Sequence, residues 1–301
     1  MNNFIIILCL IVLGVLLKKS KQFPENTSQV LNLFVIYVSL PALVMINVPR
    51  LVFSSSLWVT VITPWVILLV SVGIVLFFSR LFAWKKDTIG ALLLIVPLGN
   101  TSFLGYPMVE AFFGSHAVGY AVMYDQFGSF FALTVYGSII VALYSENSQS
   151  PSVVSIAKKI ISFPPFISFV VALSIYGVNL PNTYYDVLTP IAKTLIPVVM
   201  VAVGFQLNLR VEFDKIRAFI VGLSVKMIVA PLLAYLTFLF LKMEGEIVQV
   251  SIFEAAMPPM ITAGAIAIMA NLSPRLTAAI VTYGILLSFI TLPLWHYILG
   301  I

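Results

Sequence analysis

Long apolar stretches alternate with short polar connections along almost the whole chain. The stretches cover residues 2–17, 29–48, 56–79, 88–112, 116–144, 155–177, 187–208, 215–241, 246–270 and 276–299. Most reach the length of about 17 to 25 residues that a helix needs to cross hydrocarbon. None shows the strict alternation of a membrane strand, and in lipid every backbone polar group must be satisfied within the segment. The pattern predicts an all-α polytopic membrane protein with ten transmembrane helices.

The composition excludes a water-soluble fold. Of 301 residues, 61% are hydrophobic and 9% are charged, whereas soluble domains carry about 25% charge. The net charge of +5 is not gathered in a basic patch interleaved with aromatic residues, so we expect no nucleic-acid partner. The single cysteine, Cys9, lies in an apolar run and is predicted to be a small buried hydrophobe. One cysteine makes neither an internal disulfide nor a cysteine metal site.

The first apolar stretch has the length of a signal peptide, but we read it as a short first helix. It lacks a basic start and a small-residue cleavage site, and Lys18, Lys19 and Lys21 follow it instead.

Basic residues fall almost entirely in alternate connections. Connections 1–2, 3–4, 5–6, 7–8 and 9–10 hold Lys18, Lys19, Lys21, Arg80, Lys85, Lys86, Lys158, Lys159, Arg210, Lys215, Arg217 and Arg275. The other connections hold only Arg50 and Lys242. Because cytoplasmic connections carry the excess of Lys and Arg, this distribution predicts a cell-membrane protein with both termini outside.

The chain divides into two halves of five spans. The longest polar connection, residues 145–152, lies at the midpoint, so residues 1–144 form the first repeat and 153–301 the second. An odd number of spans inverts the second repeat relative to the first, as in many secondary transporters. Pro41 and Pro197 stand in similar segments at an offset of 156 (197 − 41), and the same offset carries Gly99–Pro107 onto Ala255–Ala263.

Spans 4 and 9 each contain a helix-breaking stretch near their middle. Pro97–Pro107 reads PLGNTSFLGYP, and Ala255–Gly264 reads AAMPPMITAG. Proline removes a backbone donor and glycine relaxes the chain, and unwound backbone at this depth is tolerated only in a protein interior or beside a watery cavity. Two matched breaks indicate a transport site, although proline kinks without a ligand are the alternative. The half-helices after the breaks present N-termini that favour an anion.

Five segments of the chain resemble the auxin efflux carrier family, which includes plant PIN-FORMED auxin exporters and bacterial malate and malonate permeases. They are GNTSFLGYP, AAMPPMITAGAIA, YVSLPALVM, Tyr124-Asp125-Gln126 and LLSFITLPLW. The resemblance implies that broken helices 4 and 9 cross at the bilayer midplane and that Asn100 contacts a substrate carboxylate. It also implies a scaffold of spans 1, 2, 6 and 7 and a moving core of spans 3–5 and 8–10. Gly128-Ser129 departs from the family, which often has Asn there, and the long central loop of many plant members is missing.

The candidate site residues lie at the two breaks and in the spans beside them. The predicted substrate-binding residues are Asn100, Thr101, Ser102, Pro107, Met257, Pro258, Pro259, Thr262 and Tyr124. Ionisable residues within spans are costly and usually functional, and the candidates for coupling or charge compensation are Asp125, Glu254, Lys193 and Lys226.

Several roles are open for these charges. A structural ion pair between Asp125 and Lys193 and a proton-carrying or gating role for Asp125 or Glu254 are alternatives. Lys226 is predicted to face the substrate or to neutralise the ends of the half-helices. Glu110, His116 and His296 are expected to be peripheral.

These patterns predict a secondary transporter that moves a small organic anion by alternating access. The anion is a dicarboxylate such as malate or malonate, or an auxin-like carboxylate. A sodium- or proton-coupled symporter of organic anions is the alternative, and a homodimer is left open. An intramembrane enzyme is the rival class, but HExxH, GxSxG and P-loop motifs and a GxGD partner for Tyr124-Asp125 are missing from the sequence. We expect no catalytic residues, cofactor or metal.

Overall fold

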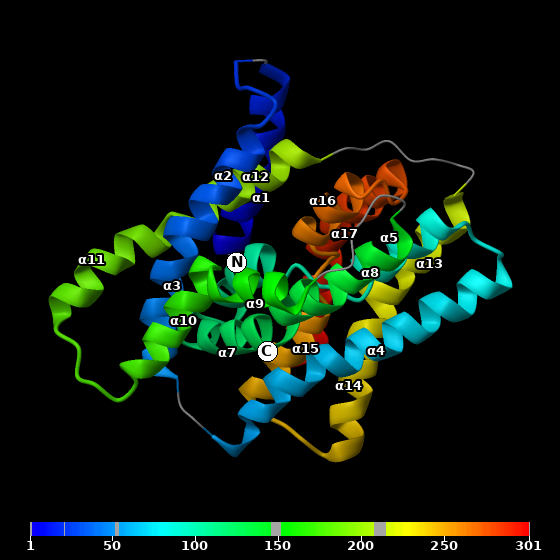
Figure 1. The fold of residues 1–301 in the computed structure, drawn as a ribbon. Coiled ribbons are helices and arrows are strands. Elements are labelled where there is room, and N and C mark those ends of the chain that lie inside the picture. The colour runs from blue at the N-terminus through cyan, green and yellow to red at the C-terminus, as the bar shows by residue number, and fades with distance from the viewer. Residues whose placement is uncertain (1, 21, 52–53, 146–151, 208–214, 301) are drawn as a thin grey trace.

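The computed structural model describes residues 2–20, 22–51, 54–145, 152–207 and 215–300, and all regular elements in these ranges are helices (Figure 1). The predicted all-α class is confirmed. Residues 146–151 of the predicted linker, together with Lys21 and Arg210, lie outside the described residues.

The first half contains five helical segments in the predicted order. The first segment is α1 (Asn2–Ser20), the second joins α2 (Thr27–Phe34), η1 (Val35–Ser39) and α3 (Leu40–Asn47), and the third is α4 (Trp58–Leu81). The fourth joins α5 (Lys86–Ile95), η4 (Thr101–Gly105) and α6 (Tyr106–Phe113). The fifth joins α7 (Val118–Tyr124), η6 (Asp125–Phe130), η7 (Leu133–Gly137) and α8 (Ser138–Tyr144). The elements η1, η4, η6 and η7 are π-helical turns within these segments.

The described residues from 152 onward also form helices. The elements are α9 (Val153–Ile161) and α10 (Pro164–Ser174); α11 (Asn182–Lys193) and α12 (Leu195–Gln206); α13 (Ile216–Ser224), the π-helical turn η9 (Val225–Val229) and α14 (Ala230–Leu241); α15 (Glu246–Ala255) and α16 (Ile261–Met269); and α17 (Pro274–Ile298).

Six stretches of the described residues are long and apolar enough to cross a membrane as single helices. They are Thr27–Arg50, Trp58–Leu81, Ser115–Tyr144, Asn182–Gln206, Ile216–Leu241 and Pro274–Ile298. The pair α9 and α10 raises the number to seven if it is one span, bent by 64° at its break. Pro164 and Pro165 explain this bend, because neither residue can donate a backbone hydrogen bond to the preceding turn.

The two predicted breaks are present, and their backbones meet. The first broken segment leaves helical structure after Ile95 and resumes at Thr101, and the second leaves it after Ala255 and resumes at Ile261. Gly99 and Pro259 form an antiparallel bridge. The amide of Asn100 donates to the carbonyl of Pro258 at 2.8 Å, and the amide of Met260 donates to that of Leu98 at 2.9 Å. We call this junction the crossing.

The helices pack as two groups. In one, α1 and α2 pack against α12, and α3 packs against α10 and α11. In the other, α15 packs against α4, α7 and α14, and α5 packs against α8, α16 and α17. Within the first group, the hydroxyls of Ser39 and Thr194 are 2.7 Å apart, so the irregular points of two segments contact each other directly.

Two glycines bring α1 and α12 into backbone contact. A Cβ atom on Gly14 would collide with the backbone carbonyl of Val201, and one on Gly204 with that of Ile11. Small residues at such a contact let membrane helices approach more closely than side chains normally permit.

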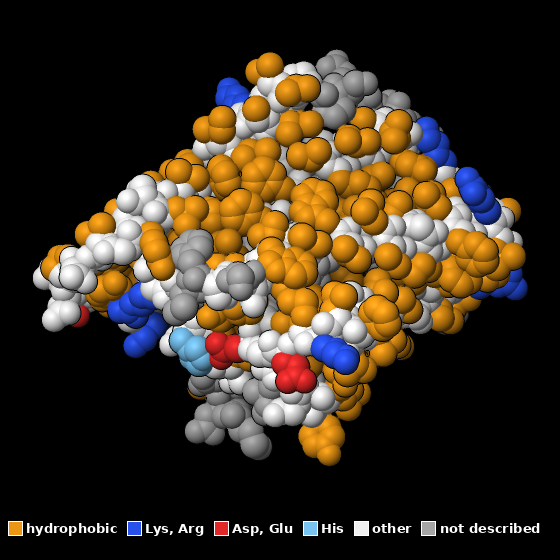
Figure 2. All heavy atoms as spheres, turned by 90° about the horizontal axis from the view of Figure 1, so that it is seen from below, with side chains coloured by type: hydrophobic (Ala, Val, Ile, Leu, Met, Phe, Trp, Pro, Cys, Tyr) orange, Lys and Arg blue, Asp and Glu red, His pale blue; other side chains and the backbone are white. Residues whose placement is uncertain are grey.

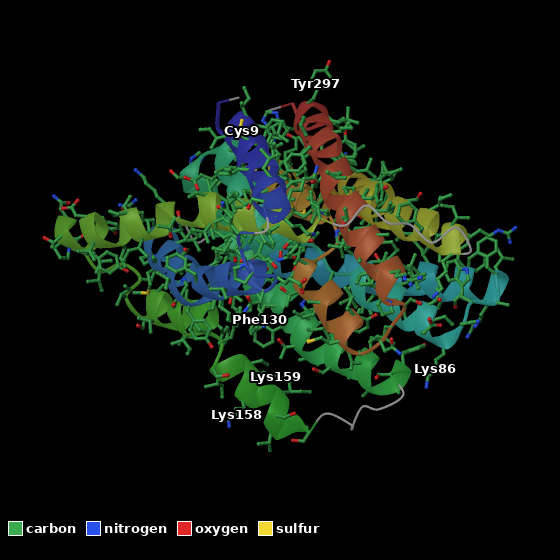
Figure 3. All side chains as sticks on the ribbon, turned by 90° about the horizontal axis from the view of Figure 1, so that it is seen from above. Cys9, Lys86, Phe130, Lys158, Lys159 and Tyr297 are labelled. Carbon is green, nitrogen blue, oxygen red and sulfur yellow. The ribbon has the colours of Figure 1, made fainter. Side chains whose placement is uncertain are left out.

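Apolar side chains dominate the outer surface. Figure 2 shows a broad band of hydrophobic side chains on one face, with charged side chains at its margins. In Figure 3, Lys86, Lys158 and Lys159 lie on the opposite side of the view from Tyr297 of α17. Cys9, predicted to be buried, is exposed on α1. That prediction was wrong because α1 is apolar around its whole circumference and only one of its sides packs against α12.

The helix ends also separate by side. In Figure 1, α1 and α4 end towards the top and right of the molecule, and α10 and α14 end towards the left and bottom.

Candidate functional site

Asn100 stands at the centre of the crossing, directly before the helical turn that resumes the first broken segment. Its side chain is only 2% exposed. Its backbone carbonyl accepts hydrogen bonds from the amides of Leu104 and Gly105, while its side-chain amide nitrogen has no hydrogen-bond partner. The first amides of the resumed helix also lack intrahelical partners. This residue therefore offers buried donor capacity beside the positive end of a half-helix.

Asp125 of η6 lies against the first broken segment and is fully hydrogen-bonded. Its carboxylate accepts from the Thr101 hydroxyl at 2.5 Å, the Tyr106 hydroxyl at 2.9 Å and the Gln126 side-chain amide at 3.0 Å. The carboxylate is buried, and charge-assisted hydrogen bonds of this kind are the strong ones. The network fixes the orientation of Thr101 and Tyr106 around the break.

Lys226 lies at the other side of the crossing. Its side chain is 1% exposed, and Nζ donates to the carbonyl of Ala255, the last residue of α15, at 3.4 Å. A Cβ atom built on Gly99 would stand 3.0 Å from this Nζ, so the glycine makes room for the ammonium group. A cation at a helix C-terminus complements the negative end of the dipole. This position matches the predicted alternative of neutralising a half-helix end.

Glu254 is buried near Asp125 and Lys226 but forms a hydrogen bond with neither of them. Its side chain is 0% exposed, and neither carboxylate oxygen has a hydrogen-bond partner. The carboxyl group lies against the backbone of Gly105, where an added Cβ would stand 2.5 Å from Oε2. In the described part of the chain the two ion pairs are His116–Glu246 and Lys215–Asp87, so Glu254 and Lys226 are neighbours without being paired.

The remaining predicted binding residues divide between the crossing and the surface. Pro107, Met257, Pro258, Pro259 and Tyr124 are buried, and Ser102 is half-buried. Thr262, which we expected to supply a hydrogen bond at the site, is exposed on the first turn of α16. Helix α16 turns this side chain away from the buried part of the crossing, and its contact with a substrate stays a prediction.

Lys193 does not join the buried charges. It is exposed, and the oxygens of Asp125 are taken by neutral donors from Thr101, Tyr106 and Gln126. The predicted alternative of an ion pair between Asp125 and Lys193 is therefore wrong. Lys193 instead lines a cavity of about 400 Å³, the Arg50 pocket, formed by Leu43, Ile46, Asn47, Arg50, Glu110, Ser115, His116, Val118, Thr189, Ala192, Lys193 and Ile196.

The Arg50 pocket separates the two packing groups at one end of the molecule. Arg50 and Lys193 come from the group that contains α1 and α12, Glu110 comes from α6, and His116 comes from the connection between α6 and α7. Arg50 lies over the ring of Tyr185 at 3.9 Å, which holds its guanidinium in place. His116 and Glu246 are 2.7 Å apart beside this pocket. Glu110 and His116 are thus peripheral, as predicted.

A smaller cavity of about 180 Å³ lies between α12 on one side and α16 and α17 on the other. We call it the Gln206 pocket, and it is lined by Gln206, Leu207, Ile261, Gly264, Ala265, Ile268, Ala278, Val281, Thr282 and Ile285. No charged side chain is among these described lining residues.

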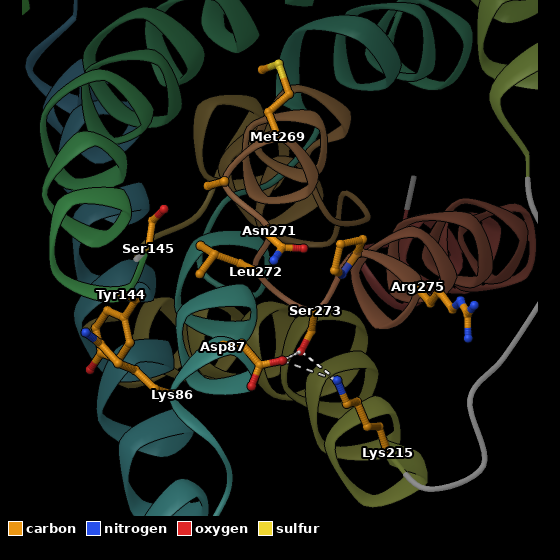
Figure 4. A pocket seen from close by; sticks show the side chains of 12 residues that line it. Lys86, Asp87, Tyr144, Ser145, Lys215, Met269, Asn271, Leu272, Ser273 and Arg275 are labelled. Atoms are coloured by element: carbon orange, nitrogen blue, oxygen red, sulfur yellow. Dashed lines mark hydrogen bonds and ion pairs between the residues drawn. The ribbon is translucent and has the colours of Figure 1, made fainter. Parts of the chain in front are cut away.

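A basic cavity of about 500 Å³ lies near the starts of α5, α13 and α17 (Figure 4). Here the Ser273 hydroxyl donates to Asp87 at 2.6 Å, and Lys215 Nζ lies 2.9 Å from Ser273 Oγ and 3.3 Å from Asp87. Partial burial raises the pKa of Asp87, but the Ser273 hydroxyl and the Lys215 ammonium outweigh this effect, so the pKa lies below its ordinary value. The cavity contains none of the predicted site residues.

Comparison with known proteins identifies the chain's family. The family described as membrane transport protein matches residues 1–296, almost the whole chain. The chain belongs to this family. The resemblance drawn from its sequence motifs is thereby confirmed, and the multi-pass membrane protein is a transporter.

Relatives cover the transporter from end to end. An uncharacterized transporter of Methanocaldococcus jannaschii is 25% identical over 99% of this chain and 98% of its own length. One of Methanothermobacter thermautotrophicus is also 25% identical, over 97% and 96%. The uncharacterized transporter YfdV of Escherichia coli is 24% identical over 97% and 95%. These names indicate a transporter rather than an enzyme.

Sequence reasoning missed part of the transporter's buried network. Tyr106 and Gln126 donate to Asp125, yet neither was predicted as a site residue. Tyr106 directly precedes Pro107 at the end of the break, and Gln126 follows Asp125, so proximity to a predicted residue was the available signal. The sequence does not show which way either side chain points.

Proposed function

We propose that this transporter carries a small organic anion across the cell membrane by alternating access, and that the anion binds at the crossing. The observation that carries the proposal is the buried, unpartnered side-chain amide of Asn100 at the start of a resumed helix. An amide donor and a half-helix N-terminus together suit a carboxylate, and discontinuous helices that aim N-termini at anionic groups are typical of secondary transporters.

The surrounding charges support an anionic substrate. Lys226 is the buried cation beside the crossing, and the charge of Asp125 is spread over three donors. Arg50 and Lys193 add positive charge to the Arg50 pocket, which attracts anions towards the boundary between the packing groups. Dicarboxylates such as malate and malonate and auxin-like monocarboxylates all present the carboxylate that Asn100 recognises.

In this proposal the ten helical segments are ten spans in two inverted repeats of five. The broken segments cross at the midplane, and both termini face outward. The first packing group, with spans 1, 2, 6 and 7, is the scaffold, and spans 3–5 and 8–10 move as the core. The Arg50 pocket then opens to the outside and the Gln206 pocket to the cytoplasm, so the two pockets are the two entrances to one site.

The test is malate flux into proteoliposomes with Asn100→Ala. We expect flux to fall by about tenfold or more, because one lost hydrogen bond to a charged group is worth about 1.5 to 3 kcal/mol. Asn182→Ala is the matched control, since Asn182 is exposed at the start of α11. Normal flux in a folded Asn100→Ala protein would overturn the site assignment. A thermal-shift comparison of malate, malonate and indole-3-acetate then identifies the preferred carboxylate.

A further inference from the structure

Glu254 differs from every other buried charge at the crossing because nothing hydrogen-bonds to it. Asp125 accepts three hydrogen bonds, and Lys226 donates one to Ala255. Both oxygens of Glu254 are buried and without a hydrogen-bond partner. An ionised carboxylate in such surroundings loses its hydration and gains no hydrogen bonds in exchange, which is strongly unfavourable. The neutral acid is the form that this environment accepts.

The neighbouring titratable groups reinforce this conclusion. Asp125 of span 5 and Lys226 of span 8 are the charged groups that act on Glu254, and Tyr106 and Tyr124 are neutral phenols near it. Asp125 and Lys226 carry opposite charges, so an ionised Glu254 adds one uncompensated negative charge in a region of low dielectric.

The other titratable groups on the helices packed against α15 lie elsewhere. His116 contacts Glu246, at the opposite end of α15, Glu110 lines the Arg50 pocket, and His296 stacks on Phe112. None of these groups offers Glu254 a counter-charge among the described contacts.

Gly105 links Glu254 to the anion site. Its amide donates to the carbonyl of Asn100 at 3.0 Å, and its α-carbon side faces the Glu254 carboxyl group. One turn of backbone, from Asn100 to Gly105, therefore has the proposed substrate-binding side chain at its start and the carboxyl group of Glu254 packed against its end. A substrate anion at Asn100 adds negative charge next to Glu254, which further favours the neutral acid.

We propose that Glu254 carries the proton that couples anion transport to the proton gradient. This inference rests on the proposed function and names the coupling ion of the same site. Glu254 is protonated while the crossing is closed around it, and the anion binds in this form. When the core rearranges and water reaches the carboxyl group, the O–H bond breaks, the proton passes to water, and the remaining carboxylate helps to expel the anion. One proton thus accompanies one anion in the same direction.

A proton fits this position better than a sodium ion. A sodium ion needs several oxygen ligands around it, and neither oxygen of Glu254 takes part in a hydrogen-bonded cluster with other oxygen groups. The neighbouring Lys226 ammonium repels a second cation, whereas a proton needs only one carboxyl oxygen.

The experiment compares two measurements on the same proteoliposomes: malate exchange at equal pH, and malate accumulation driven by an imposed pH gradient. Exchange moves no net protons, while accumulation requires the coupling group. In Glu254→Gln we expect the ratio of accumulation to exchange to fall at least about tenfold and exchange to lose its dependence on pH. Glu244→Gln, which changes an exposed glutamate in the connection before α15, leaves the ratio at the wild-type value.

A second variant and a direct readout guard against misfolding. Gly105→Ala places a methyl group against Glu254 and should lower the ratio in the same direction. In weakly buffered detergent solution, malate addition should change the number of bound protons in the wild type and not in Glu254→Gln. Accumulation in Glu254→Gln that still follows the pH gradient, or wild-type accumulation that follows only a sodium gradient, would overturn the proton assignment.

Failure of this inference differs from failure of the proposed function. If Asn100→Ala abolishes exchange while Glu254→Gln keeps proton-driven accumulation, the anion site stands and the coupling residue is wrong. If Asn100→Ala exchanges malate normally, the anion site itself is wrong.

Discussion

The Arg50 pocket and the Gln206 pocket occupy the boundary between the same two groups of helices but differ in chemistry and size. The first holds about 400 Å³ and is lined by Arg50, Lys193, Glu110 and His116 among others. The second holds about 180 Å³ and has no charged lining residue among those described. In the proposed function these pockets are the two entrances to one site, and they are unequal in this conformation.

The difference shows which parts of the architecture are repeated and which are specialised. Each half contributes one broken segment to the crossing, and the two backbones meet in the bridge between Gly99 and Pro259. The polar side chains at the crossing differ between the halves, since Asn100, Thr101 and Asp125 belong to the first half and Lys226 and Glu254 to the second. In this interpretation one half binds the substrate and the other balances its charge.

The largest expected effect comes from engineered cysteines that compare the accessibility of the two pockets. Both variants are made in a Cys9→Ser background. We expect Ala192→Cys in the Arg50 pocket to react with an anionic thiol reagent at least about tenfold faster than Ala265→Cys in the Gln206 pocket. The reason is that the proposed orientation opens the Arg50 pocket, which carries positive charge, to the outside, where the reagent is added. The measurement is labelling of intact cells. Equal rates would show that the pockets are equally accessible, and labelling of Ala265→Cys alone would reverse the predicted orientation.

A smaller effect is expected from the charge of the Arg50 pocket. Lys193→Glu should raise the malate concentration for half-maximal uptake by about threefold to tenfold at low ionic strength, and the effect should shrink in high salt because exposed charges are screened. Lys242→Glu changes another exposed lysine, outside this pocket, and serves as the control. An unchanged salt dependence in Lys193→Glu would mean that this lysine does not attract the substrate.

The smallest effect concerns the hydrogen-bonded cluster of Asp87, Ser273 and Lys215. The pKa of Asp87 lies below its ordinary value in the folded protein, so the ionised carboxylate contributes stability above the unfolded pKa of about 3.9. This stability disappears as the pH falls through the folded pKa. Asp87→Asn should lower the melting temperature in detergent by about 1 to 3 °C at pH 7, since the carboxylate is 38% exposed and partly screened.

The difference between wild type and Asp87→Asn should shrink as the pH falls below the unfolded pKa of about 3.9 and vanish below the lower folded pKa, where both proteins lack the charge. Glu246→Gln, which removes the more exposed pair with His116, should change the melting temperature less. A larger loss in Glu246→Gln than in Asp87→Asn would contradict the ranking of these two contacts.

The sequence predicts the helical segments and the two breaks because both follow from local chemistry. Proline and glycine interrupt a helix wherever they stand, and long apolar runs identify spans without knowledge of the partners. The contacts of Asp125 are different in kind. Thr101 is 24 residues away, and its hydroxyl reaches the carboxylate only because the resumed helix turns towards η6. No spacing rule anticipates that orientation.

The incorrect predictions have a common physical origin. Cys9 and Lys193 are both exposed, although Cys9 was predicted to be buried and Lys193 was a candidate ion-pair partner of Asp125. In a membrane protein, apolar residues face lipid as well as the core, so hydropathy does not distinguish the two sides of a helix. Position along a span likewise does not reveal whether a lysine points into the protein or into a surface pocket.

The close contact between α1 and α12 has a mechanical consequence. At Gly14 and Gly204 the backbones of α1 and α12 are in direct contact, and no side chains separate the two helices there. A pair joined in this way resists both sliding and rotation. In the proposed mechanism this pair belongs to the stationary scaffold, and alternation between the two entrances is produced by displacement of the crossing relative to it.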